Sequence, residues 1–143
     1  SQGRDQARLS DMRVCDYAAE EAPIFSETTS QQEVLQYLQK TGWNEAYAID
    51  SETQKFIGFL RAVDLEAGSE TPIASKLQIS DLSFDETTSV RQAMEKLSSF
   101  VGDAIPIIKS SDGSLVGVVT EGAIIQSYLN LAADLRREEN AGL

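Results

Sequence analysis

The chain has 143 residues, of which 41% are hydrophobic, and its 12 basic and 23 acidic residues give a formal net charge of −11. This composition argues against a disordered chain and predicts one compact unit or two small halves that share a core. The acidic balance argues against nucleic acid as a partner, because a phosphate backbone is held by Lys and Arg.

Missing residue types narrow the function further. The chain has no histidine and a single cysteine, Cys15. Acid–base catalysis by histidine, a zinc site and an internal disulfide are therefore not expected. We expect a protein that is not an enzyme, with no catalytic residues and no metal site. Cys15 is interpreted as a small apolar packing residue, and a reactive thiol near Arg13 is the alternative.

Membrane and targeting segments are not visible in the sequence. No run of 18 apolar residues and no secretory signal occurs, so we expect no direct membrane insertion of this fragment. The chain begins Ser1-Gln2-Gly3 rather than with methionine, which suggests a piece of a longer protein.

The first half of the chain has the pattern of one strand–helix–hairpin unit. Residues 1–13 are a lead-in and residues 14–67 form a first repeat. Its expected elements are a short strand near Pro23–Phe25, a helix after Ser30, strands over Glu45–Asp50 and Phe56–Leu60, and a short helix from Ala62. The helix is indicated by apolar residues at helical spacing, and the strands by apolar runs on either side of a polar turn.

The second half repeats this pattern. A connector over residues 68–78, small and polar at Gly68–Thr71, leads into a second repeat over residues 79–127. Its expected elements are a short strand near Leu82–Phe84, a helix after Ser89, strands over Ala104–Lys109 and Ser114–Val119, and a short helix from Glu121. Residues 128–143 are expected to be a C-terminal helix and tail.

The two halves align at an offset of 59 residues. Residues 27–65 match residues 86–124 without a gap, with eight of the 39 pairs identical. The letters Glu-Thr-Thr-Ser at 27–30 recur at 86–89, and each serine begins a capping box, with Glu33 or Gln92 three residues later. A shorter echo pairs Val14-Cys15-Asp16-Tyr17 with Ile79-Ser80-Asp81-Leu82. The repeat predicts an α/β (α+β) fold of two β-α-β-β-α units related by a pseudo-twofold axis.

The second copy carries motifs of a known family. An apolar-proline pair lies in Ile105-Pro106-Ile107-Ile108, and a polar turn and an apolar strand follow in residues 112–120. With the tandem arrangement, these motifs resemble a CBS domain pair, although the first copy has Tyr47 in place of the proline. The resemblance implies a non-catalytic regulatory module, with two clefts between its copies. In many members a cleft binds AMP, ADP, ATP or adenosine.

The family's nucleotide signature, Gly-apolar-x-Thr/Ser-x-x-Asp, is split between the two copies. Residues 117–123 keep the hydroxyl at Thr120 and lack the acid, whereas residues 58–64 keep Asp64 and have Arg61 in place of the hydroxyl. The resemblance implies that a bound nucleotide contacts Asp64, Arg61, Ile105, Pro106, Val118 and Thr120. The alternative is that Arg61 is a solvated or subunit-pairing charge and Thr120 only a helix cap. We expect weak or absent binding, with AMP or adenosine preferred over ATP.

The flanking segments suggest a larger protein. Residues 8–14 and 128–140 resemble the borders of the cytoplasmic CBS pair in bacterial ClC-type chloride channels and transporters. This resemblance implies a module at the cytoplasmic face of the inner membrane that modulates or scaffolds the dimer of its channel. Its partners are then a second copy, as a homodimer, and the membrane domain of the same polypeptide. The alternative is a nucleotide-sensing module of a soluble enzyme, or a stand-alone CBS protein.

Two apolar features have a packing interpretation. The C-terminal segment carries an apolar stripe at helical spacing, which we interpret as core or dimer surface. The stripe consists of Ile124, Ile125, Tyr128, Leu129, Ala132 and Leu135. Trp43, in the loop after the first helix, is expected to be partly buried, with an interface role as the alternative.

Overall fold

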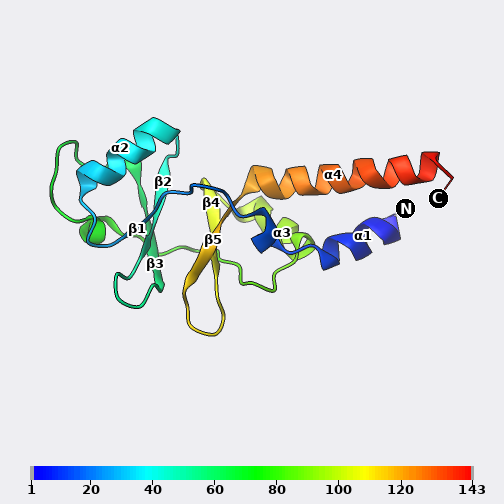
Figure 1. Ribbon diagram of the computed structural model, residues 1–143, viewed down its shortest axis with the longest axis horizontal. Helices are drawn as coiled ribbons and strands as arrows, with labels where there is room; N and C mark the ends of the chain where they lie inside the picture. Colours follow the sequence, from blue (N-terminus) through cyan, green and yellow to red (C-terminus); the bar gives the residue numbers. More distant parts are fainter. Residues whose placement is uncertain (1, 143) are drawn as a thin grey trace.

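Two small sheets, each flanked by helices, make up the computed structural model, which describes residues 2–142 (Figure 1). The helices and strands are α1 (Gln2–Asp11), β1 (Ile24–Ser26), α2 (Gln31–Thr41), β2 (Glu45–Ile49), β3 (Phe56–Arg61), α3 (Val90–Lys96), β4 (Ala104–Ile108), β5 (Leu115–Thr120) and α4 (Glu121–Asn140). Four short 3-10 turns complete the order: η1 (Val14–Tyr17), η2 (Ala62–Asp64), η3 (Ile73–Lys76) and η4 (Leu97–Ser99). The expected mixed α/β fold class is confirmed.

The repeated letters Glu-Thr-Thr-Ser form the turn into a helix in both halves. The Ser30 hydroxyl accepts a hydrogen bond from the Glu33 amide at 3.2 Å, and the Ser89 hydroxyl accepts one from the Gln92 amide at 3.1 Å. At Ser89 the box is complete, because its amide also donates to the Gln92 side chain at 2.9 Å. Capping therefore fixes the start of α2 and of α3 at the expected residue.

The sheets differ between the halves. In the first half, β1 pairs in parallel with β2, and β2 pairs antiparallel with β3. In the second half, β4 and β5 form an antiparallel pair, and the strand expected near Leu82–Phe84 is reduced to a single bridge between Phe84 and Ile107.

A proline explains the missing strand. The Tyr47 amide donates to the Pro23 carbonyl at 2.9 Å and so holds the chain that leads into β1. The residue 59 positions later is Pro106, which has no N–H to donate to Leu82.

The helices expected at the end of each repeat also differ from their prediction. The helix expected from Ala62 is the 3-10 turn η2, whereas the one expected from Glu121 is the 20-residue helix α4. α4 runs without a break past residue 127, where the C-terminal segment was expected to begin. Its length follows from tertiary packing, since its inner face lies on α3 and α1.

The chain leading into each repeat docks on the other repeat. Val14 donates its amide to the Thr88 carbonyl at 3.0 Å, and Ile73, 59 residues later, donates to the Thr29 carbonyl at 2.9 Å. Both side chains are fully buried. The counterpart of Val14–Tyr17 is therefore Ile73–Lys76, and the predicted echo at Ile79–Leu82 was wrong. Reciprocal contacts at one constant offset are what a pseudo-twofold arrangement produces.

Gly58 permits one of these crossings. A Cβ atom on Gly58 would lie 2.5 Å from the Gln78 carbonyl oxygen, and the residue has φ of +145°. The chain before the second repeat passes directly over β3 at this point, because Gln78 and Phe59 exchange two backbone hydrogen bonds. The glycine of the first signature thus serves backbone packing.

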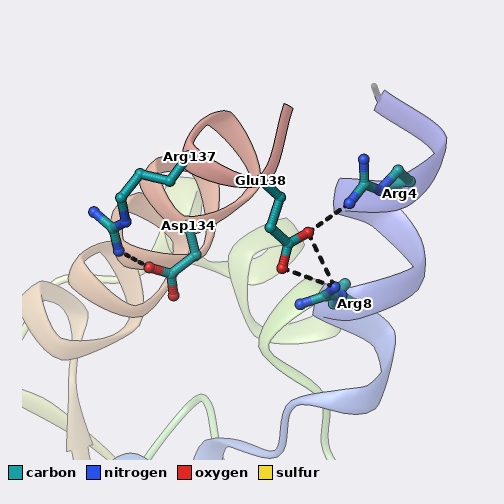
Figure 2. Close-up of polar contacts among 5 residues, drawn as sticks. All are labelled: Arg4, Arg8, Asp134, Arg137 and Glu138. Carbon is teal, nitrogen blue, oxygen red and sulfur yellow. Dashed lines mark hydrogen bonds and ion pairs between the residues drawn. The ribbon is translucent and has the colours of Figure 1, made fainter. Parts of the chain in front are cut away.

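Helices α1 and α4 extend side by side away from the sheets (Figure 1). Leu9 of α1 is 4% exposed and packs in one core cluster with Leu131 and Leu135 of α4. Arg4 and Arg8 of α1 both point to the Glu138 carboxylate, at 2.6 and 3.4 Å (Figure 2). Within α4, the helix that carries Glu138, Arg137 pairs with Asp134.

The predicted apolar stripe of the C-terminal segment divides between core and surface. Ile124 and Leu135 are buried, as part of the core, while Ile125 and Leu129 are 41% and 51% exposed. The stripe is therefore wider than the contact with α1 and α3, and its outer edge faces solvent.

Candidate functional site

A cavity of about 310 Å³ lies between the two halves; we name it cavity A. Its lining comes from both sheets and from two connecting segments of the second half. The lining residues are Glu45, Tyr47, Phe59, Ser80, Asp81, Leu82, Ser99, Phe100, Val101, Ala104 and Pro106.

Tyr47 and Pro106, which occupy equivalent positions in the two repeats, both line cavity A. Tyr47 is 1% exposed, and its hydroxyl donates to the Ala104 carbonyl at 3.3 Å. Burial raises the pKa of Tyr47, so this hydroxyl stays protonated. Phe59 and Phe100 supply two further aromatic rings, both partly buried. A planar apolar ring matches such a lining, because aromatic and aliphatic faces stack on it.

The charged groups lining cavity A are acidic. Glu45 and Asp81 contribute carboxylates, and no Lys or Arg is among the lining residues of this cavity. Burial raises the pKa of Glu45, and the Asp103 carboxylate raises it too, although a bond from the Asp103 amide and the charge of Arg61, its pairing partner on β3, act the other way. Cavity A therefore favours a neutral ligand with hydrogen-bond donors over a polyanion.

Asp103 fixes Glu45 across the boundary between the halves. The Asp103 carboxylate accepts the amides of Asn44 and Glu45 at 2.6 and 2.9 Å, and the Asp103 amide donates to Glu45 Oε1 at 2.8 Å. Asn44 and Asp103 are themselves 59 positions apart, so this exchange lies where the repeats meet. Glu45 is thus held in place at the wall of cavity A.

A second space, cavity B, has Asp103 in its own lining. It has a volume of about 260 Å³ and is lined by Thr41, Gly42, Trp43, Asp103 and Thr120. Trp43 is half-buried and packs edge-to-face on Tyr47, with ring centroids 6.3 Å apart. The structure thus gives Trp43 a packing contact within the chain.

The structure places the six predicted site residues in different environments. Pro106 lines cavity A and Thr120 lines cavity B. Ile105 is buried in the core beneath α3 and α4, and Val118 is buried between the sheets with Tyr47. These four residues therefore do not line one common space.

The remaining two predicted residues are exposed. Arg61 and Asp64 line neither cavity A nor cavity B. Asp64 accepts a hydrogen bond from the Gln78 side chain at 3.3 Å. Thr120 accepts one from the Ala123 amide at 3.0 Å and so caps α4.

Most residues of cavity A were not predicted as site residues. Ser80, Asp81 and Leu82 belong to the segment read as an echo, and Glu45 and Tyr47 belong to the predicted strand β2. Tyr47 and Pro106 lie at equivalent positions of the two repeats. That equivalence is the sequence feature that could have predicted β2 and β4 as walls of one cavity. Nothing in the sequence pattern indicated Phe100, which enters from the loop after η4.

Within 2–142, no helix is long and apolar enough to cross a membrane. The same part of the chain has no group of three or more Cys, Asp or Glu placed to hold a metal ion.

Comparison with known proteins identifies the fold. Residues 74–130 match the family model of the CBS domain. No curated protein sequence matches the chain.

Solved structures with the same architecture cover nearly the whole chain. CbpB in complex with c-di-AMP is 17% identical, with a TM-score of 0.75 over 95% of this chain and 97% of that one. CBSX2, a CBS-pair protein of Arabidopsis thaliana, in complex with AMP, is 19% identical, with a TM-score of 0.70 over 85% and 98%. The CBS domain of a bacterial CNNM/CorC family Mg²⁺ transporter in complex with ATP is 13% identical, with a TM-score of 0.67 over 88% and 93%. At these identities the likeness shows the fold.

Proposed function

Because the chain has the fold of a CBS domain pair and its second repeat matches the CBS domain family model, we propose that it is a non-catalytic regulatory module that binds an adenine nucleoside or nucleotide in cavity A. The observation that carries this proposal is the aromatic and proline lining of a cavity shared by both repeats. Structures of similar fold contain c-di-AMP, AMP and ATP, which supports an adenine ligand.

The charge of the cavity sets the expected order of ligands. With Glu45 and Asp81 at its wall and a net charge of −11 on the chain, each added phosphate is repelled. Adenosine therefore binds best, followed by AMP, then ADP and ATP, and the differences shrink at high salt. Binding is weak, because the ribose aspartate and the hydroxyl of the family signature never occur in the same copy.

Calorimetric titration of the chain with the four ligands tests this proposal. We expect adenosine affinity to fall about tenfold in Phe100→Ala, equivalent to about 1.4 kcal/mol, because a stacking face is lost. Thr120→Ala is the matched control from cavity B and should leave the affinity unchanged once its folding is verified. Micromolar ATP binding, or a loss of adenosine affinity in Thr120→Ala alone, would contradict binding in cavity A. The latter result would support the signature residues Thr120, Val118 and Ile105, with Arg61 and Asp64, instead.

For the larger protein we propose the cytoplasmic domain of a membrane transport protein, with a chloride channel or transporter as first candidate. The resemblance of residues 8–14 and 128–140 to the borders of that domain supports it. A transporter CBS domain among the similar structures supports the broader class. The alternative, a module of a soluble enzyme or a stand-alone sensor, predicts a full-length gene product without many hydrophobic spans before Ser1. Reading that gene product decides between the two.

A further inference from the structure

A five-residue segment, Ile79–Ser83, crosses from one repeat to the other along cavity A; we name it the strap. On one side, Gln78 donates to the Phe59 carbonyl at 2.8 Å and accepts from the Phe59 amide at 3.0 Å. On the other side, Phe84 donates to the Pro106 carbonyl at 2.9 Å and accepts from Ile108 at 2.8 Å. The strap is therefore anchored on β3 of the first half and on β4 of the second.

Between these anchors the strap has few restraints. Within residues 2–142, none of its five residues takes part in a backbone–backbone hydrogen bond. Ile79 is 88% exposed, although it is a large apolar residue. Ser80, Asp81 and Leu82 form part of the wall of cavity A. Leu82 also packs against the buried core of the second half, so it is the one apolar side chain of the strap with such a contact. Backbone that lacks backbone hydrogen bonds and has a single such apolar contact opens more readily than the strands on either side.

The equivalent segment of the first repeat, residues 20–24, is held in place. The Tyr47 amide donates to the Pro23 carbonyl at 2.9 Å, and the Tyr37 hydroxyl donates to the Glu21 carbonyl. The residues 59 positions after these donors are Pro106 and Lys96. Proline has no amide hydrogen and lysine has no hydroxyl, so both restraints are missing from the second repeat.

We propose that the strap is a ligand-responsive lid of cavity A, released by Pro106 and ordered when a planar ligand packs between Leu82 and Phe100. The ligand part of this inference rests on the proposed function. The two anchors belong to different repeats, so ordering of the strap couples ligand binding in cavity A to the relative position of the two halves. The lid thus provides a way for ligand binding to change the arrangement of the whole module.

Backbone ¹⁵N relaxation of the ligand-free chain tests the release by Pro106. We expect order parameters below about 0.6 in the strap and near about 0.85 in residues 20–24. Pro106→Ala restores an amide donor opposite Leu82 and should raise the values in the strap. Lys96→Tyr, at an exposed position, is a second variant that restores the other donor. Tyr37→Phe is the matched control, which should loosen residues 20–24 and leave the strap unchanged.

Adding adenosine to the same sample tests the ligand response. Binding should shift the Phe100 amide resonance and raise the order parameters of the strap towards those of residues 20–24. A shift at Phe100 with an unchanged strap would overturn the lid and leave the proposed function intact. No shift at any adenosine concentration up to its solubility limit would contradict the proposed function, and the lid with it. Equal order parameters in the two segments of the ligand-free chain would refute the release by Pro106.

Discussion

Glu27 and Glu86 show why the four letters Glu-Thr-Thr-Ser recur as a block. The Glu27 carboxylate accepts hydrogen bonds from the amide and hydroxyl of Ser51, at 2.9 and 3.1 Å. The Glu86 carboxylate accepts the same pair from Ser110, with the amide at 3.0 Å. Each glutamate therefore ties the turn before a helix to the turn inside the following hairpin, while the serine three residues later caps the helix.

Glu45 and Glu86 are carboxylates in opposite environments. Burial raises the pKa of Glu45, whereas hydrogen bonds led by the Ser110 hydroxyl lower the pKa of Glu86. Ionisation of Glu45 thus opposes folding above its unfolded pKa. Ionisation of Glu86 favours folding above its unfolded pKa, and that contribution is lost as the pH falls through its lower folded pKa.

Replacing each of the two glutamates by glutamine should change the melting temperature in opposite directions. At pH 7, Glu45→Gln should raise the melting temperature, because it removes a charge disfavoured by burial and keeps the acceptor for the Asp103 amide. Glu86→Gln should lower the melting temperature at pH 7. Both differences should disappear as the pH falls well below 4.5, the ordinary pKa of glutamate. Thermal unfolding followed by circular dichroism between pH 3 and pH 7 measures both, and changes of equal sign at pH 7 would contradict this account.

Helix α1 packs on α3 and α4 of the second repeat, although it precedes the first repeat in the chain. Leu9 is buried against α4, whereas the ion pairs from Arg4 and Arg8 to Glu138 lie at partly exposed side chains, with 32% to 50% of each accessible (Figure 2). Exposed ion pairs contribute little, because water and salt screen them and ordering long side chains costs entropy. The apolar contact is therefore the main attachment of α1.

Two substitutions separate these contributions. Leu9→Ala should lower the free energy of unfolding by about 2–5 kcal/mol, because it removes buried methyl groups and leaves a cavity. Glu138→Gln should lower it by less than about 1 kcal/mol, with a smaller effect at high salt. Urea unfolding curves measure both changes. A larger loss in Glu138→Gln than in Leu9→Ala would show that the ion pairs hold α1.

The whole molecule is a pair of repeats joined by exchange of their lead-in segments. Met12 and Val14 bond to the helix entry of the second repeat, and Thr71 and Ile73 to that of the first. Neither repeat can separate without breaking these bonds and exposing the buried Val14 and Ile73. Apolar surface remains on the outside of the pair, at Ile125 and Leu129 of α4.

We propose that this outer face of α4 contributes to a homodimer. Light scattering at high micromolar concentration should give a mass of twice the 15.6 kDa chain. Leu129→Lys places a charge at a half-exposed position and should shift the chain to monomer without unfolding it. A native chain that stays monomeric at that concentration would contradict the proposed dimer.

The sequence by itself determined the features that depend on neighbouring residues. Capping predicted that helices begin after Ser30 and Ser89, and turn chemistry predicted the two hairpins. Apolar spacing predicted the offset of 59 residues between the repeats. These are local effects, because each capping donor lies three positions from its acceptor and each hairpin is closed by a short polar turn. The CBS-type fold of the pair was also visible in the motif around Pro106.

Only the tertiary structure decided which segments meet across the repeats. The exchange of lead-ins placed Ile73, and not Ile79, as the counterpart of Val14. The length of α4 depends on its packing against α1. The walls of cavity A come from segments up to 61 positions apart, from Glu45 to Pro106. The sequence shows that Pro106 has no amide hydrogen. It does not show which carbonyl loses its donor as a result. The structure shows this, because the Tyr47 amide, at the equivalent position of the first repeat, donates to the Pro23 carbonyl.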